Sequence, residues 1–292
     1  MSPSEPTTGA DAASREPRAP SLGLALLGSE LRVLFGRRRT WAMLAALAAV
    51  PVLIAVAVRL SSSPDSPGDG PAFLSSITQN GLFVGLTALI VSVPLFLPLT
   101  VGVVAGDTIA GEASLGTLRY LLVAPSGRVR LLLVKYAGAA AFCLAATLVV
   151  VLVGAAVGAL LFPVGPVTLL SGDTVGVGGY AVRAALFAAY VSMSMLGLSA
   201  IGLFVSTLTT VPVGAMAATI VLSAVSQILD ALPQLSVIHP WLFSHHWLGF
   251  ADLLRTPIDF TTFGENAVLQ LGYIAVFGAL AYGRFSTKDI LS

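Results

Sequence analysis

The histidines and a nearby aspartate are the residues whose types best suit a metal ion. His239, His245 and His246 are the only three histidines of the chain, and Asp252 follows them closely. Imidazole and carboxylate groups are common ligands of zinc. Neighbouring side chains on a helix point about 100° apart, so His245 and His246 form a poor chelating pair. We therefore expect no metal site and favour a structural role for this stretch.

ATP hydrolysis would require a glycine-rich phosphate loop that ends in lysine followed by serine or threonine. The two lysines of the chain are Lys135, which follows Val134, and Lys288, which follows Thr287. Because neither lysine lies in such a loop, we expect no cofactor on this chain.

A nucleophilic serine or cysteine is also poorly supported. A serine nucleophile needs a histidine base within hydrogen-bond reach. Ser199 lies within a long apolar segment, whereas all the histidines lie outside such segments. Cys143 is in another apolar run, where the reactive thiolate is disfavoured. The sequence therefore predicts no catalytic residue and a protein that is not an enzyme.

The composition indicates a membrane protein. Of 292 residues, 56% are hydrophobic and only 10% are charged, against roughly 25% charged residues in a typical soluble domain. Uncharged runs of about 20 residues are long enough to cross a bilayer as helices. We predict an all-α polytopic protein in which residues 40–292 form a six-helix transmembrane domain. The expected spans cover residues 41–58, 82–106, 136–162, 182–206, 213–229 and 266–283.

Two regions precede the first expected span. Residues 1–20 are rich in proline, serine and alanine, which predicts a disordered tail. Residues 21–39 place leucines at helical spacing and end in three consecutive arginines, a pattern typical of an amphipathic helix on the membrane surface. The arginines could also belong to a nucleic-acid-binding arm. We favour a membrane anchor and expect no nucleic acid partner, because the cluster directly precedes a span.

The distribution of basic residues predicts the orientation. Of the 15 Lys and Arg residues, only Arg59, Arg183 and Arg255 fall on the side of the expected spans opposite the termini. Basic residues concentrate on the cytoplasmic side of membrane proteins. We therefore expect both termini to be cytoplasmic, in a multi-pass protein of the plasma membrane.

A long segment, residues 230–265, separates the fifth and sixth expected spans. It is too apolar for an open loop and too interrupted by charges for a span. We predict a folded exterior segment of short amphipathic helices, with Trp241 and Trp247 at the membrane interface.

Residues 107–136 are unusually charged for this chain. Six charged side chains fall within them, namely Asp107, Glu112, Arg119, Arg128, Arg130 and Lys135. Ile109, Leu115, Leu118 and Leu122 are predicted to line one face of a helix, and a turn at Ala124-Pro125-Ser126-Gly127 follows. An apolar stripe in water needs a covering partner, so this cytoplasmic region, 107–135, is a candidate docking site.

A motif in the same stretch carries a family resemblance. Its residues are Ala110-Gly111-Glu112, Gly116-Thr117-Leu118-Arg119, Leu121-Leu122, Pro125, Arg128 and Lys135. Their identities and spacing resemble the loop between the second and third spans of type-2 ABC exporter permeases. The surface helix before the first span, the folded exterior segment and the C-terminal tail are also similar to that family. Ala113-Ser114 depart from it, because the family often carries further charge there.

The resemblance implies a permease subunit that forms a homodimer or heterodimer and pairs with separate ABC ATPase subunits, which bind the ATP and magnesium. It also implies that the helix after the second span couples to the ATPase. The residues that would do so are Glu112, Gly116, Thr117, Leu118 and Arg119, with Pro125 and Arg128 fixing the hairpin.

The substrate is less constrained. Spans without central charge favour a hydrophobic or amphipathic export substrate such as a drug, lipid or peptide. Two alternatives remain open at this point, namely export of an ion or small metabolite, and a membrane enzyme or assembly factor that transports nothing.

Overall fold

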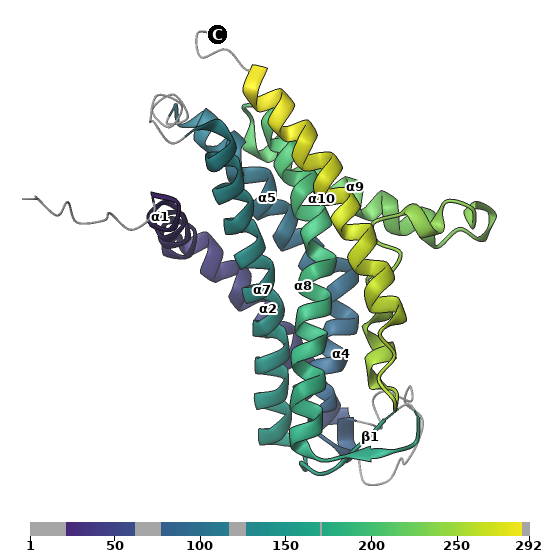
Figure 1. The fold of residues 1–292 in the computed structure, drawn as a ribbon. Coiled ribbons are helices and arrows are strands. Elements are labelled where there is room, and N and C mark those ends of the chain that lie inside the picture. Colours follow the sequence, from purple (N-terminus) through teal and green to yellow (C-terminus); the bar gives the residue numbers. More distant parts are fainter. Residues whose placement is uncertain (1–21, 62–76, 117–126, 170, 288–292) are drawn as a thin grey trace, which may run out of the picture.

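A computed structural model of the chain describes residues 22–61, 77–116, 127–169 and 171–287. The described part is almost entirely helical (Figure 1). Its main helices are α1 (Leu22–Gly36), α2 (Arg38–Ser61), α4 (Phe83–Val91), α5 (Leu97–Ser114), α7 (Arg128–Leu161), α8 (Val177–Leu208), α9 (Pro212–Asp230) and α10 (Thr261–Thr287). A short hairpin, β1 (Val167–Thr168) and β2 (Thr174–Val175), joins α7 to α8.

Six helices are long and apolar enough to cross a membrane, which confirms the predicted all-α, six-span fold class. They are α2, α4 continued through α5, α7, α8, α9 and α10. The end of the bundle where α5 ends and α7 begins also holds α1 and the end of α10 (Figure 1). We call this the terminal end, and the opposite end, which carries β1 and β2, the hairpin end.

Proline shapes the second span. A π-helical turn, η1 (Ser92–Phe96), connects α4 to α5 and contains Pro94. Proline cannot donate a backbone hydrogen bond, so a locally widened turn lets the helix continue past it. The two helices therefore form one irregular span.

The helices at the terminal end extend further than the expected spans. The second span, expected to end at residue 106, continues as α5 to Ser114, and α7 begins at Arg128 rather than near residue 136. The predicted single stripe through Ile109 and Leu115 is wrong, because α5 stops between these two residues. Ile109 is buried, whereas Leu115 is 74% exposed. Leu118 and Leu122 lie outside the described residues.

Glycines allow α4 and α7 to pack closely. Gly81 lies against Gly158, and Gly85 lies against Gly154, with backbone atoms in contact. A Cβ atom on Gly158 would overlap the carbonyl oxygen of Gly81. Small residues permit such close approach between membrane helices.

We expect Gly158→Ala to lower the free energy of unfolding by about 1–3 kcal/mol, because the new methyl group forces the helices apart. Gly278→Ala in α10 is a matched control, since no atom lies within 4 Å of its Cβ position. The control should be neutral or slightly stabilising, because alanine favours the helix by roughly 0.5–1 kcal/mol. Chemical denaturation of both variants in detergent measures the difference, and equal stability would contradict the packing described.

The segment between α9 and α10 folds inward as turns. It contains the 3₁₀ helices η2 (Pro233–Leu235), η3 (His239–Trp241) and η4 (Gly249–Leu254), so the expectation of amphipathic helices is replaced by shorter turns. The Tyr190 hydroxyl in α8 donates a hydrogen bond to the His246 carbonyl at 2.5 Å, and the Tyr190 ring meets Phe250 edge-on. The segment is therefore part of the protein core.

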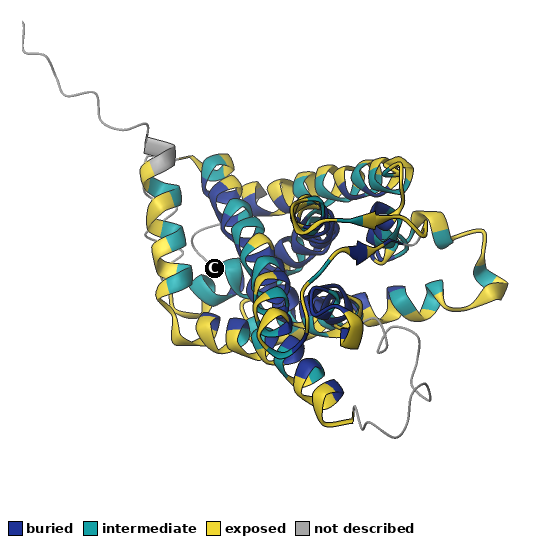
Figure 2. Ribbon diagram, turned by 90° about the horizontal axis from the view of Figure 1, so that it is seen from below, coloured by how far each residue is buried: buried dark blue, intermediate teal, exposed yellow. Residues whose placement is uncertain are grey.

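The two tryptophans of this segment lie in different surroundings. Trp241 is 74% exposed, as a residue at a membrane interface would be. Trp247 is 2% exposed and packs against Phe243, so its predicted interfacial position is wrong. Figure 2 shows the general pattern, in which buried residues face the centre of the bundle and exposed residues cover its outside.

Candidate functional site

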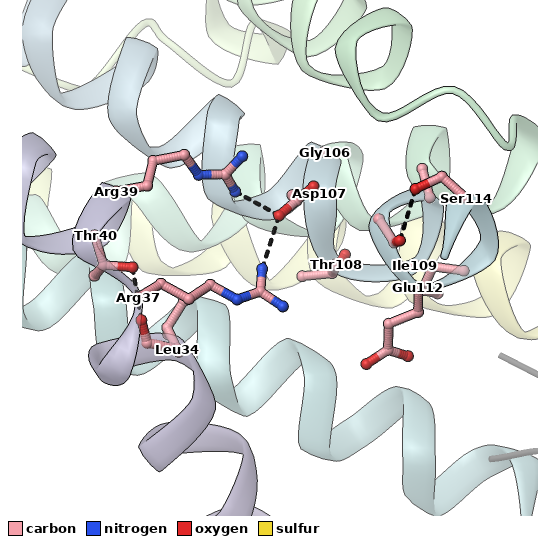
Figure 3. Close-up of polar contacts among 12 residues, drawn as sticks. Leu34, Arg37, Arg39, Thr40, Gly106, Asp107, Thr108, Ile109, Glu112 and Ser114 are labelled. Carbon is pink, nitrogen blue, oxygen red and sulfur yellow. Dashed lines mark hydrogen bonds and ion pairs between the residues drawn. The ribbon is translucent and has the colours of Figure 1, made fainter. Parts of the chain in front are cut away.

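The last turns of α5 form the centre of the candidate site. Two acids, Asp107 and Glu112, project from this helix at the terminal end of the bundle (Figure 3). The helix stops after Ser114, and Gly116 takes a left-handed conformation with φ of 70°. Glycine adopts this conformation without steric cost and commonly ends helices. Both acids therefore lie within the final three turns of a helix that continues into the membrane.

Asp107 receives two arginines from the bend between α1 and α2. Arg37 Nη1 lies 2.9 Å from Asp107 Oδ2, and Arg39 pairs with the same oxygen (Figure 3). Thr40 Oγ1 donates to the Leu34 carbonyl at 2.6 Å, which stabilises the bend. The arginines that were predicted as a membrane anchor thus also hold α5.

Glu112 belongs to a second ion pair, centred on a buried lysine. Lys135 Nζ of α7 lies 2.8 Å from Glu30 Oε2 of α1, and it also bonds Glu112 Oε1. The Lys135 side chain is only 5% exposed. A buried ammonium group is stable only when paired and hydrogen-bonded, so Lys135 fastens α1 and α5 to α7.

These two groups form one balanced set, which we call the ion cluster. It contains Glu30, Arg37, Arg39, Asp107, Glu112 and Lys135, three acids and three bases. The open space among them is about 30 Å³, comparable to the volume of a single water molecule. The ion cluster is therefore a packed joint between helices and has no room for a ligand.

Further contacts join α5 and α7 to the rest of the bundle. Ser206 Oγ of α8 donates to the Gly106 carbonyl at 2.7 Å and accepts the Ile109 backbone N–H at 3.0 Å. Arg128 Nη1 donates to the Phe285 carbonyl of α10 at 3.2 Å. A buried apolar layer lies below, made of Ile109, Leu131, Leu132, Leu203, Ala281 and Phe285. A force on the end of α5 would reach α1, α7 and α8 directly, and α10 through this layer.

The structure describes three of the seven predicted coupling residues. Glu112 has an internal partner in Lys135 and is mostly buried. Gly116 ends α5, and a Cβ atom there would contact nothing within 4 Å. Arg128 holds the start of α7 to the end of α10. Thr117, Leu118, Arg119 and Pro125 lie outside the described residues.

Sequence reasoning missed the importance of Glu30 and Lys135. Lys135 had been assigned to the lipid headgroup level, and Glu30 had not been singled out. One signal was available, because Lys135 is followed by a long uncharged run and lies a full two turns inside α7. A charge placed that deep in a membrane helix calls for a partner, although spacing alone does not identify Glu30, 105 residues away.

The exposed part of the site is small and apolar. Leu115 follows directly after α5 and is 74% exposed. The charges beside it are largely consumed by internal pairs. This arrangement suits docking of another protein and transmission of its movement, rather than bond-making chemistry.

Two comparisons with known proteins bear on identity. A search of individually curated proteins finds no match. The family model described as ABC-2 family transporter protein matches residues 24–290, which include every described membrane span and the ion cluster. The predicted resemblance to a type-2 ABC permease is thereby confirmed, and the chain belongs to the ABC-2 family of transporter proteins, as the multi-pass membrane permease of an ABC transporter.

Proposed function

We propose that the chain is the permease subunit of an exporter and that a separate ABC ATPase docks at the end of α5. Family membership implies partnership with such an ATPase. The ATPase would bind ATP and magnesium, and closure on ATP would move the spans as rigid bodies. The observation that carries the proposal is the continuity of α5, which runs from within the bundle to the exposed Leu115 and is clamped by the ion cluster.

The roles of the individual residues follow from this geometry. Glu112 acts through Lys135, so that α1 and α7 move with α5. Gly116 ends the helix and gives access to Leu115, while Arg128 carries the movement to α10. We assign the remaining contacts with the ATPase to Thr117, Leu118 and Arg119, and the turn to Pro125.

The proposed exporter lies in the plasma membrane with both termini in the cytoplasm, works as a homodimer or heterodimer, and has α1 along the membrane surface. The excess of basic residues on the side of the termini supports this orientation. Arg37, Arg39 and Arg128 all lie at the terminal end.

A hydrophobic or amphipathic substrate such as a drug, lipid or peptide fits the interior best. Among the described residues, the buried charged side chains are Lys135 and Arg183, each within eight residues of the start of its helix. Other buried polar side chains of the spans are serine, threonine, asparagine and glutamine. A charged cargo would therefore meet no compensating charge midway through the bundle.

We expect Leu115→Asp to abolish co-purification of the ATPase while leaving the unfolding temperature unchanged, because this exposed side chain has few contacts within the chain. Val164→Asp, a half-exposed position at the hairpin end, is the matched control and should retain the ATPase. Pull-down from the native membrane measures both. Retention of the ATPase by Leu115→Asp would refute docking at this position.

The cargo is tested separately by ATP hydrolysis in the reconstituted complex. Hydrophobic and amphipathic compounds should stimulate it, whereas simple ions and small metabolites should not. The opposite pattern would favour the alternative of an ion or metabolite exporter.

A further inference from the structure

An open groove runs beside α10 on the side of the turns that follow α9. It has a volume of about 1280 Å³ and lies between residues 240–246 and the first half of α10. Apolar side chains of α10 line its length, including Val268, 73% exposed, and Val276, 57% exposed. An apolar surface of this size along a candidate membrane span can receive a long hydrocarbon chain.

The two walls of the groove are firmly connected. Tyr273 Oη of α10 donates to the Trp241 carbonyl at 2.8 Å. Gln270 Nε2, also of α10, donates to the Phe243 carbonyl at 2.9 Å. The groove is therefore a permanent feature of the fold and does not depend on a ligand to open it.

One end of the groove carries an uncompensated acid. In the part of the chain that the structure describes, the Glu265 carboxylate has neither an ion pair nor a hydrogen bond. His245 is engaged by Asp230, with Nδ1 2.6 Å from Oδ1. Burial, and then the neighbouring His245, lower the pKa of His246, so His246 is neutral at pH 7 and leaves the charge of Glu265 unbalanced.

Aromatic side chains surround this end. Trp241, Phe260 and Tyr273 all line the groove, and the faces of such rings attract ammonium groups. The helix rises about 18 Å between Glu265 and Phe277, the last residue of the lining. No lysine or arginine is among the lining residues, so a phosphate group would find an acid and no permanent cation.

We propose that this groove binds a single-tailed amphipathic amine, with its ammonium group beside Glu265 and its hydrocarbon tail along α10 towards Phe277. The absence of a lining cation favours an amine without a phosphate over a phospholipid. The site lies outside the ion cluster, and binding there requires no ATPase. It therefore goes beyond the proposed export function and can be tested on the permease alone.

The test is a titration of the full chain, in phosphatidylcholine nanodiscs, with a fluorescent dodecylammonium probe. Glu265→Gln should weaken binding by about tenfold or more, the effect of losing roughly 1.4 kcal/mol. Trp241→Ala should weaken it by about fivefold, within the range of one cation–π contact. Glu265→Asp, which keeps the charge, should retain most of the affinity, and dodecanol should not compete.

Two matched variants control for general effects. Asp173→Asn removes another exposed acid at the hairpin end, and Trp41→Ala removes another exposed tryptophan, so both should bind as the unaltered chain does. An unchanged affinity in Glu265→Gln would overturn the proposal, and would mean that Glu265 serves only to stabilise the start of α10. Competition by phosphatidylethanolamine as strong as by dodecylamine would also overturn it, because the groove would then be a phospholipid site.

Discussion

Replacing Lys135 by methionine is expected to destabilise the protein by about 3–5 kcal/mol, the usual cost of removing one partner of a buried ion pair. Glu30 and Glu112 would then face each other without the shared ammonium group. Chemical denaturation of the purified protein in detergent measures the change. The two helices that Lys135 holds, α1 and α5, should also become accessible to protease before the rest of the bundle.

Two variants control this experiment. Arg130→Met removes a half-buried basic side chain from the same helix and should cost much less. The triple change Glu30→Gln, Glu112→Gln and Lys135→Met should recover most of the lost stability, because no uncompensated charge stays buried. A Lys135→Met protein as stable as the Arg130→Met protein would show that the ion cluster does not hold α1 to α7.

Reversing the charge of Glu112 is expected to have the second large effect. Glu112→Lys sets an ammonium group against Lys135, and like charges in such contact cost several kcal/mol. We expect ATP-driven transport to fall by at least about tenfold, equivalent to roughly 1.4 kcal/mol of coupling. Transport and ATPase co-purification are measured on the same membranes.

Glu112→Gln is the conservative control for that change, since Lys135 keeps its contact with Glu30. It should retain more transport than Glu112→Lys. If Glu112→Lys left both transport and ATPase co-purification unchanged, Glu112 would have no role in coupling.

The number of spans could be predicted because it depends on local composition. A run such as residues 136–162 contains no charge, and hydrophobic length alone makes it a membrane helix. The helical spacing of residues 21–39 was similarly informative, and the structure has α1 at Leu22–Gly36.

The ends of α5 and α7 could not be predicted, because they depend on contacts between distant parts of the chain. Asp107 was interpreted as a charge in water, but Arg37 and Arg39, about 70 residues earlier, neutralise it in place. The helix can therefore continue past Asp107 to Ser114. Trp247 illustrates the same limit, since its amphipathic ring suits both a membrane interface and a protein core, and only the packing around Phe243 decides.

The most direct test of the account is a photo-crosslinking measurement at Leu115. A photoreactive amino acid at this exposed position should form a crosslink to the ATPase subunit in native membranes, and the yield should change when ATP is trapped. The same amino acid at Val164, at the hairpin end, should form none. An ATPase that co-purifies with the permease and crosslinks from Val164 but not from Leu115 would contradict docking at the end of α5.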